Sequence, residues 1–155
     1  MNFNSIGVIR GEKYAKQNKT LSFCANQNML FHYLDRSTYR YSKYSQETLK
    51  NLQKLFGDFY MIPEGGNNFL GVKGCEEIFK EVNIDVDYIS CSVGTGCTAS
   101  GLIRSMNRKQ HFIGFSPFRK IIEQKKHIFK YCNPNCTHWD IIADNHFGGF
   151  NKVND

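Results

Sequence analysis

The sequence predicts an α/β protein in which helices flank parallel sheets in two lobes. Short apolar segments of strand length alternate with longer segments of helical periodicity, and the links between them are short. This alternation is typical of parallel sheets, whose strands are joined by helical crossovers. At 155 residues the chain can form one domain or two small lobes. The glycine turn after Pro63 favours two: a three-layer α/β lobe over residues 1–62 and part of a larger lobe over residues 63–155.

The first lobe is predicted to contain three strands and two helices. The strands are short apolar runs over residues 5–10, 30–34 and 59–62. The helices cover residues 21–29 and 45–56, and the second has an apolar stripe formed by Leu49, Leu52, Leu55 and Phe56. Ser45 precedes Thr48 by three residues, so we expect only a weak cap, and Gly57 is expected to end the helix.

The second lobe is predicted to alternate in the same way. Its strands cover residues 87–93, 111–115 and 139–143. Its helices cover residues 70–82, 98–106 and 118–131. The last helix holds the densest basic cluster, from Arg119 to Lys130, and its helical spacing is more typical of a solvated face than of a nucleic-acid stripe. The other basic residues behind the net charge of +6 are scattered, so we expect no nucleic-acid partner.

The turn between the strand at 87–93 and the helix at 98–106 is the strongest candidate for binding chemistry. Its residues, 94–101, read Gly-Thr-Gly-Cys-Thr-Ala-Ser-Gly. Glycines let the backbone approach an anion closely. The unpaired N–H groups at a helix start, together with the positive end of the helix dipole, favour a phosphate there. We therefore predict an anion site at this turn, and we group with it the glycine turn at 63–68, which reads Pro-Glu-Gly-Gly-Asn-Asn.

Composition also bounds the cellular setting. The chain has six cysteines, no apolar stretch long enough to cross a bilayer, and no basic start followed by an apolar core as in a signal peptide. Cysteines without an export signal indicate reduced thiols. We therefore expect a cytoplasmic protein without a membrane partner.

Six short segments are spread nearly end to end along the chain: IGVIRGE at 6–12, TLSF at 20–23, IPEGG at 62–66, GVKGCEEI at 71–78, VGTGCT at 93–98 and HFGGF at 146–150. In this order and spacing the chain resembles the pyridoxal-phosphate enzymes that include 1-aminocyclopropane-1-carboxylate deaminase and D-cysteine desulfhydrase. The resemblance implies a partial tryptophan synthase beta-like fold (fold type II) and pyridoxal 5'-phosphate as cofactor. It also implies a small amino-acid substrate, either 1-aminocyclopropane-1-carboxylate or D-cysteine, and homo-oligomeric full-length relatives.

The resemblance assigns the cofactor phosphate to the glycine loop of the larger lobe. In the family, backbone N–H groups and a threonine hydroxyl hold the phosphate, and those roles fall here on Gly94, Thr95, Gly96, Cys97 and Thr98. Many relatives have a second glycine where Cys97 stands. A cysteine is tolerated there if its backbone keeps a negative φ. We interpret Cys97 as a small residue at a helix start, without a redox or metal role.

The catalytic parts of the family are not found in this sequence. The imine-forming lysine of the relatives lies in a Ser-Gly-Asn-Lys type segment, and a Ser-Asn-His segment faces the substrate; neither occurs here. Lys19, which follows an asparagine, and Lys73 are interpreted as structural. Many relatives have tyrosine where Phe150 stands. We therefore expect a chain truncated at both ends, with no catalytic residue and no covalent cofactor, that is inactive alone as a deaminase or lyase.

Three alternatives remain. The chain can be a non-catalytic remnant or paralogue that binds a phosphate-bearing ligand. Gly94-x-Gly96-x-x-Ala99 also fits a dinucleotide fingerprint, but no acidic residue stands about 20 positions on, before Glu123. The spacing of Cys132, Cys136 and His138 partly resembles that of zinc ligands. Structural zinc takes four protein ligands, however, and no second close pair of candidate ligands accompanies these three, so we expect no metal.

Overall fold

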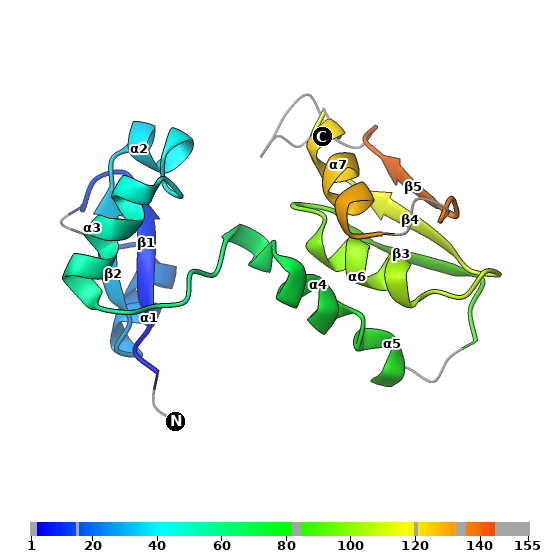
Figure 1. Ribbon diagram of the computed structural model, residues 1–155, viewed down its shortest axis with the longest axis horizontal. Helices are drawn as coiled ribbons and strands as arrows, with labels where there is room; N and C mark the ends of the chain where they lie inside the picture. The colour runs from blue at the N-terminus through cyan, green and yellow to red at the C-terminus, as the bar shows by residue number, and fades with distance from the viewer. Residues whose placement is uncertain (1–2, 15, 82–84, 120, 133–135, 145–155) are drawn as a thin grey trace. The chain divides into compact units, whose positions relative to one another are not determined.

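The computed structural model describes residues 3–14, 16–81, 85–119, 121–132 and 136–144. The chain divides into two compact units, Met1–Tyr60 and Met61–Asp155 (Figure 1). The boundary expected from the sequence lies two residues further on, at residues 62 and 63. Both units contain parallel strands flanked by helices, which confirms the α/β class. No helix in the described ranges is long and apolar enough to cross a membrane.

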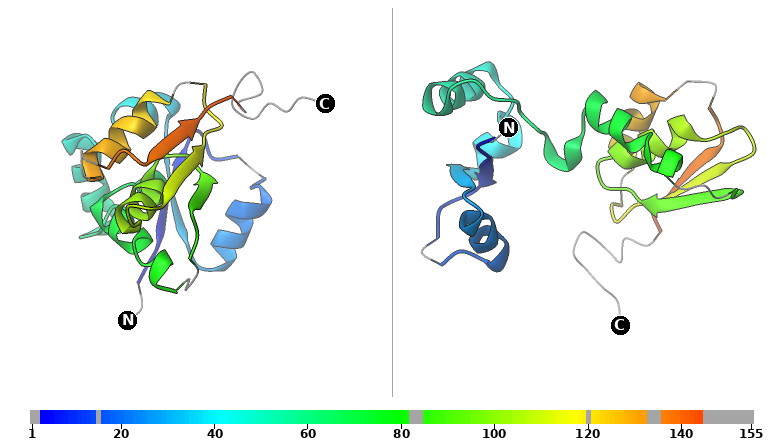
Figure 2. Two further views of the ribbon diagram at one scale, coloured as in Figure 1. Left: turned by 90° about the vertical axis from the view of Figure 1, so that its right-hand side faces the viewer. Right: turned by 90° about the horizontal axis from the view of Figure 1, so that it is seen from below.

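The first unit is built on a two-stranded parallel sheet. Strand β1 (Ile6–Arg10) pairs with β2 (Leu30–Leu34), with Ile6 opposite Leu30. Helix α1 (Lys19–Asn26) forms the crossover between them and begins where Asn18 Oδ1 accepts a hydrogen bond of 2.9 Å from Leu21 N. These three elements were predicted from the sequence. The right-hand view of Figure 2 shows α1 and α3 (Gln46–Phe56) on opposite sides of the strands.

Helix α3 has a true cap, stronger than the sequence suggested. Ser45 Oγ accepts a hydrogen bond of 3.2 Å from Thr48 N and donates one of 3.1 Å to Thr48 Oγ1. The helix ends at Gly57, which has a φ of 76°, as expected. The expected apolar stripe is incomplete, because Leu52 is buried but Leu55 is 61% exposed.

Two local features of the first unit differ from the prediction. Helix α2 (Arg36–Tyr41) was not predicted; Asp35 Oδ1 starts it by accepting hydrogen bonds from Ser37 N and Thr38 N. The hydrogen bond from the Ser37 hydroxyl, followed by those from Thr38, lowers the pKa of Asp35. The predicted strand at 59–62 is wrong, because these residues form no regular structure. An apolar segment forms a β-strand only where a neighbouring strand can pair with its backbone N–H and C=O groups.

The second unit contains a three-stranded parallel sheet in the order β3-β4-β5. Ile89 of β3 lies opposite Phe112 of β4, which in turn lies opposite Trp139 of β5. All three strands were predicted, and their bounds are Tyr88–Ser92, His111–Phe115 and Trp139–Ile142. Both crossovers move the same way across the sheet, so right-handed connections place their helices on one face (Figure 2).

The three segments predicted as helices in the second unit are helical with shifted ends, and η1 (Glu64–Gly66) lies in the glycine turn after Pro63, where no helix was predicted. The predicted segments form α4 (Phe69–Cys75), α5 (Ile78–Glu81), α6 (Cys97–Ser105) and α7 (Ile122–Tyr131). The helix predicted over 70–82 is two helices, and its last residue lies outside the described residues. The helix predicted from residue 118 starts at 122, because the segment after β4 first turns where Ser116 Oγ accepts a hydrogen bond from Phe118 N.

The core of the second unit lies between the sheet and the helices α6 and α7. Phe112 from β4, Ile103 from α6 and Ile128 from α7 are each at most 2% exposed. Helix α4 packs closely on α6, because a Cβ atom at Gly101 would lie 2.3 Å from Cys75 Cβ and 2.7 Å from Val72 O. This core fixes the start of α6, where the anion site was predicted.

Candidate anion-binding site

The turn from β3 into α6 has the geometry that an anion site needs. Val93 N donates a hydrogen bond of 2.8 Å to Phe115 O, which ties the end of β3 to β4. Gly96 then has a φ of 93°, in the left-handed region that favours glycine. A Cβ atom there would lie 3.4 Å from Gln124 O and 3.4 Å from His127 Cδ2. The turn therefore lies close against α7.

The start of α6 presents backbone donors. Ser100 N and Ser100 Oγ both donate to Gly96 O, at 2.9 and 2.8 Å, which closes the first helical turn. The N–H groups before Ser100 have no acceptor within an α-helix, and the helix dipole adds partial positive charge there. Helix α6 is nine residues long, so its dipole is developed over more than two turns.

Cys97 occupies the first position of α6 with a negative φ and is 3% exposed. Its Sγ donates a hydrogen bond of 3.3 Å to Gly66 O. Burial raises the pKa of the Cys97 thiol, with a further contribution from Cys75. Cys97 is therefore a protonated, packed thiol that connects the glycine loop to the turn at Gly66.

The turn at Gly65 and Gly66 forms one side of the site. Both residues have a positive φ, of 64° and 62°. A Cβ atom at Gly65 would lie 2.7 Å from Thr95 Oγ1, so the turn is in direct contact with the glycine loop. From the sequence, residues 63–68 were grouped with the glycine loop in one phosphate-binding constellation, and the same turn was expected to be the lobe boundary. The direct contact with Thr95 depends on tertiary packing and is the part that the sequence did not predict.

A hollow of about 410 Å³ opens beside the glycine loop. It is lined by residues from three segments: Asn67, Gly94, Thr95, Glu123, Gln124, Lys126, His127 and Lys130. Of the five residues predicted to bind phosphate, Gly94 and Thr95 therefore line the hollow. Gly96 and Cys97 are buried beside it, and Thr98 is exposed on α6, where its Oγ1 lies 3.9 Å from Cys75 Sγ.

Helix α7 forms the opposite wall, which the sequence analysis interpreted as a solvated face. Lys126 Nζ lies 2.9 Å from Glu123 Oε1, and both side chains are exposed. Lys130 lies over the Tyr131 ring at 5.0 Å. The imidazole of His127 packs on the same ring with centroids 4.8 Å apart. Burial, and next the charge of Lys130, lower the pKa of His127, so its imidazole is neutral at pH 7.

Three side chains that line the hollow keep an unpaired polar atom. Asn67 Oδ1, Gln124 Oε1 and His127 Nε2 are shielded from solvent and have no hydrogen-bond partner within the described part of the chain. A buried polar atom without a partner costs about 1–3 kcal/mol. Such atoms are rare in native structures, and here all three belong to residues that line the hollow. The spacing of Gln124 and His127, three residues apart, was the available sequence signal.

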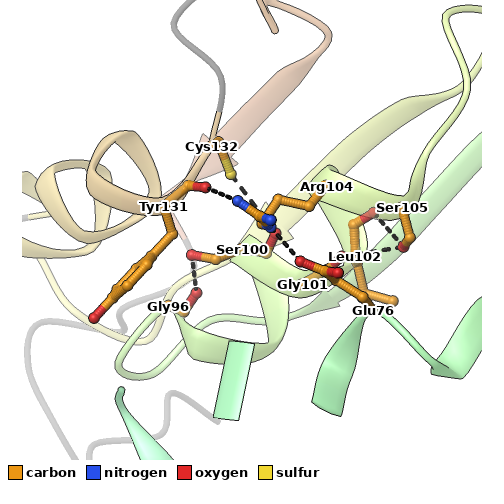
Figure 3. A network of polar contacts seen from close by, with 9 residues as sticks. All are labelled: Glu76, Gly96, Ser100, Gly101, Leu102, Arg104, Ser105, Tyr131 and Cys132. Atoms are coloured by element: carbon orange, nitrogen blue, oxygen red, sulfur yellow. Dashed lines mark hydrogen bonds and ion pairs between the residues drawn. The ribbon is translucent and has the colours of Figure 1, made fainter. Parts of the chain in front are cut away.

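A polar network holds α7 in place against α6 (Figure 3). Arg104 forms an ion pair with Glu76 and donates a hydrogen bond to Tyr131 O, so it connects the end of α4 with the end of α7. Cys132 Sγ donates to Ser100 O at 3.6 Å. The wall that carries Gln124 and His127 is therefore fixed at its carboxyl end.

Burial raises the pKa of Cys132 to about 11, so this thiol stays protonated. Within the described ranges, no group of three or more His, Cys, Asp or Glu side chains is arranged to hold a metal ion. The segment at 146–150, with Phe150, lies outside the described residues.

No family model and no curated protein matches this chain. The assignment of the site therefore rests on its residues, their geometry and their unpaired atoms.

Proposed function

We propose that this chain binds the phosphate group of pyridoxal 5'-phosphate. In this proposal it is the phosphate-anchoring part of an enzyme related to 1-aminocyclopropane-1-carboxylate deaminase and D-cysteine desulfhydrase, with a partial tryptophan synthase beta-like fold. The observation that carries the proposal is the turn at Gly94 to Gly96, which begins a nine-residue helix and borders a hollow of about 410 Å³. This volume is within the usual range for small-ligand pockets.

The residues around the hollow fit a phosphate ester. The turn has no side chains at Gly94 and Gly96, so an anion can approach the backbone donors at the start of α6. Thr95 contributes a hydroxyl, and Lys126 and Lys130 add positive charge at the rim. Glu123 is the one acidic residue among the lining side chains, and its charge is offset by the ion pair with Lys126.

Bound pyridoxal phosphate would supply an electron sink for chemistry at an amino acid. The role of the residues described here is to bind and orient this group. They are not expected to form a covalent bond to it, because the lysine-bearing segment of the family does not occur in the sequence. Lys19 begins α1 in the first unit, and Lys73 is exposed in the last turn of α4. Neither residue lines the hollow. We therefore expect binding without a stable covalent bond and without turnover by this chain alone.

The binding test compares two ligands that differ only in the phosphate. Equilibrium dialysis of the 155-residue chain should show that pyridoxal 5'-phosphate binds at least about tenfold tighter than pyridoxal, and that Thr95→Val reduces this difference. Thr48→Val, a hydroxyl loss in the first unit, is the matched control and should leave the ratio unchanged. Equal affinity for the two ligands in the unmodified chain would exclude the proposed phosphate site.

A second test concerns the covalent bond. Borohydride reduction in the presence of pyridoxal 5'-phosphate, followed by peptide mapping, should label no single lysine preferentially. Ammonia release from 1-aminocyclopropane-1-carboxylate and sulfide release from D-cysteine should stay at background. Specific labelling of Lys126 or Lys130, which line the hollow, together with turnover would contradict the expected inactivity.

A further inference from the structure

We propose that Asn67 and helix α7 complete the phosphate site, with the side chains of Asn67, Gln124 and His127 as neutral hydrogen-bond donors to a phosphomonoester dianion. This inference rests on the proposed function and extends it to residues outside the glycine loop. None of the three lies in the six segments on which the family resemblance depends. They come from two parts of the chain, the residue after η1 and the first two turns of α7.

The two buried glutamines of the second unit show why Gln124 stands out. Gln110 is 8% exposed, and its Oε1 accepts a hydrogen bond of 3.1 Å from Asn107 N. Gln124 is 6% exposed, lines the hollow and leaves Oε1 unpaired. A side chain that only filled space at this position would be apolar, because an unpaired buried amide destabilises the fold. Gln124 is therefore better explained by a ligand than by packing.

Asn67 and His127 repeat the pattern from both sides of the hollow. Asn67 Oδ1 and His127 Nε2 are shielded and unpaired within the described part of the chain. An amide presents either its oxygen or its NH₂ group after a half-turn, so Asn67 and Gln124 can each donate. A neutral imidazole donates from Nε2 when the proton is on that nitrogen. The lowered pKa of His127 is consistent with this neutral form.

The position of α7 brings these donors to the glycine loop. Gln124 O and His127 Cδ2 both lie 3.4 Å from the place that a Cβ atom of Gly96 would occupy. The Gln124 atom is its backbone carbonyl oxygen, and residues three apart on a helix share one face; both residues also line the hollow beside the loop. A phosphate at the start of α6 would then be bound by backbone N–H groups on one side and by neutral side-chain donors on the other.

This arrangement favours a phosphomonoester over a simple carboxylate. A phosphate dianion has three terminal oxygens and accepts more hydrogen bonds than the loop backbone alone supplies. Lys126 and Lys130 are exposed at the rim, where their charges attract an anion without being buried with it. The ligand class is therefore a small phosphate ester whose phosphate enters first.

The decisive experiment uses Gln124→Met, with Gln110→Met as the matched control. Affinities for pyridoxal 5'-phosphate, inorganic phosphate and pyridoxal are measured by isothermal titration calorimetry, and Tm is measured without ligand. Gln124→Met should weaken both phosphate ligands at least about tenfold, leave pyridoxal unchanged, and keep or raise Tm. Gln110→Met should lower Tm, because it removes a satisfied hydrogen bond, and should leave the ratio of phosphate to pyridoxal affinity unchanged.

A second pair of variants protects the test against misfolding. His127→Gln keeps a neutral donor and should retain most phosphate affinity, whereas His127→Leu should lose it. Unchanged phosphate affinity in both Gln124→Met and His127→Leu would overturn the role of α7. A lower Tm in Gln124→Met, similar to that of Gln110→Met, would also overturn it, because Gln124 would then be structural.

Failure of the proposed function gives a different result. If the unmodified chain binds pyridoxal 5'-phosphate no better than pyridoxal, both the phosphate site and its α7 wall are rejected. If the unmodified chain prefers the phosphate ester and Thr95→Val weakens that preference, the phosphate site stands. The variants of Gln124 and His127 then decide the α7 wall alone.

Discussion

The two units of this chain use the same strand–helix–strand plan but bury very different amounts of apolar side chain. Among the described residues of the first unit, Leu52 is the one apolar side chain that is buried. In the second unit, a cluster of nine buried residues fills the space under α6 and α7. Parallel strands need cover and a core to be stable. The comparison indicates that the second unit can hold a rigid site, whereas the first has little core with which to stabilise one.

The largest effect should come from the core beneath the site. Phe112→Ala removes a fully buried ring from the second unit, so we expect the free energy of unfolding to fall by about 3–5 kcal/mol. We also expect this variant to lose phosphate binding. Leu52→Ala in the first unit should leave phosphate binding intact even where it unfolds that unit. Urea titration of both variants measures their stability, and titration with phosphate measures their binding. Loss of binding in Leu52→Ala would show that the site depends on the first unit.

The contact between α4 and α6 should be the next most sensitive feature. Gly101→Ala places a methyl group 2.3 Å from Cys75 Cβ, so we expect it to cost about 1–3 kcal/mol of stability. Gly74→Ala, on the same pair of helices, meets nothing within 4 Å and should stabilise by about 0.5–1 kcal/mol. Denaturation midpoints compare the two directly. A stable Gly101→Ala would show that this packing is looser than described.

Gly96 should affect both stability and binding. Its φ of 93° is strained for any other residue, and a Cβ atom would contact α7, so Gly96→Ala should cost about 1–2 kcal/mol. It should also weaken phosphate affinity, because the loop and α7 would be pushed apart. Gly57→Ala in the first unit, whose φ of 76° is also positive and whose Cβ would meet nothing within 4 Å, is the control for strain alone. Equal phosphate affinity in these two variants would argue against close packing at Gly96.

The smallest expected effect concerns pH. The pKa of His127 is lowered below its ordinary value of 6.5 in the folded chain, so folding favours the neutral imidazole. This contribution is complete above pH 6.5 and is lost as the pH falls through the lowered pKa, because the unfolded chain takes up the proton first. The urea midpoint of the unmodified chain should therefore fall more steeply than that of His127→Gln between about pH 7 and pH 5. Parallel curves would show that His127 is not shielded.

Local signals were enough to predict the five strands that the structure describes and the position of the glycine turn before α6. The bounds predicted for the strands at 30–34 and 111–115 agree with β2 and β4, because both are apolar runs between turn residues. The glycine loop after β3 was also located at the start of a helix, where its small residues indicated it. These features depend on residues that are close in the sequence.

The features that the sequence did not predict depend on contacts between residues that are distant in the sequence. The strand predicted at 59–62 has the composition of a strand but does not pair, and composition alone does not report a partner. The wall of the site on α7 was interpreted as solvated because its lysines dominate the pattern. Gln124 is nevertheless buried, and its backbone carbonyl lies against the turn at Gly96. Helix periodicity identifies a face, but only the tertiary structure shows what covers it.

In the proposed site, the start of α6 and the wall of α7 bind one phosphate group from opposite sides. A crystal structure of the chain with pyridoxal 5'-phosphate tests it most directly. We expect the phosphate oxygens within hydrogen-bond distance of the backbone N–H groups at the start of α6 and of the Gln124 amide. A well-defined phosphate bound anywhere else, with this hollow left to water, would contradict the account.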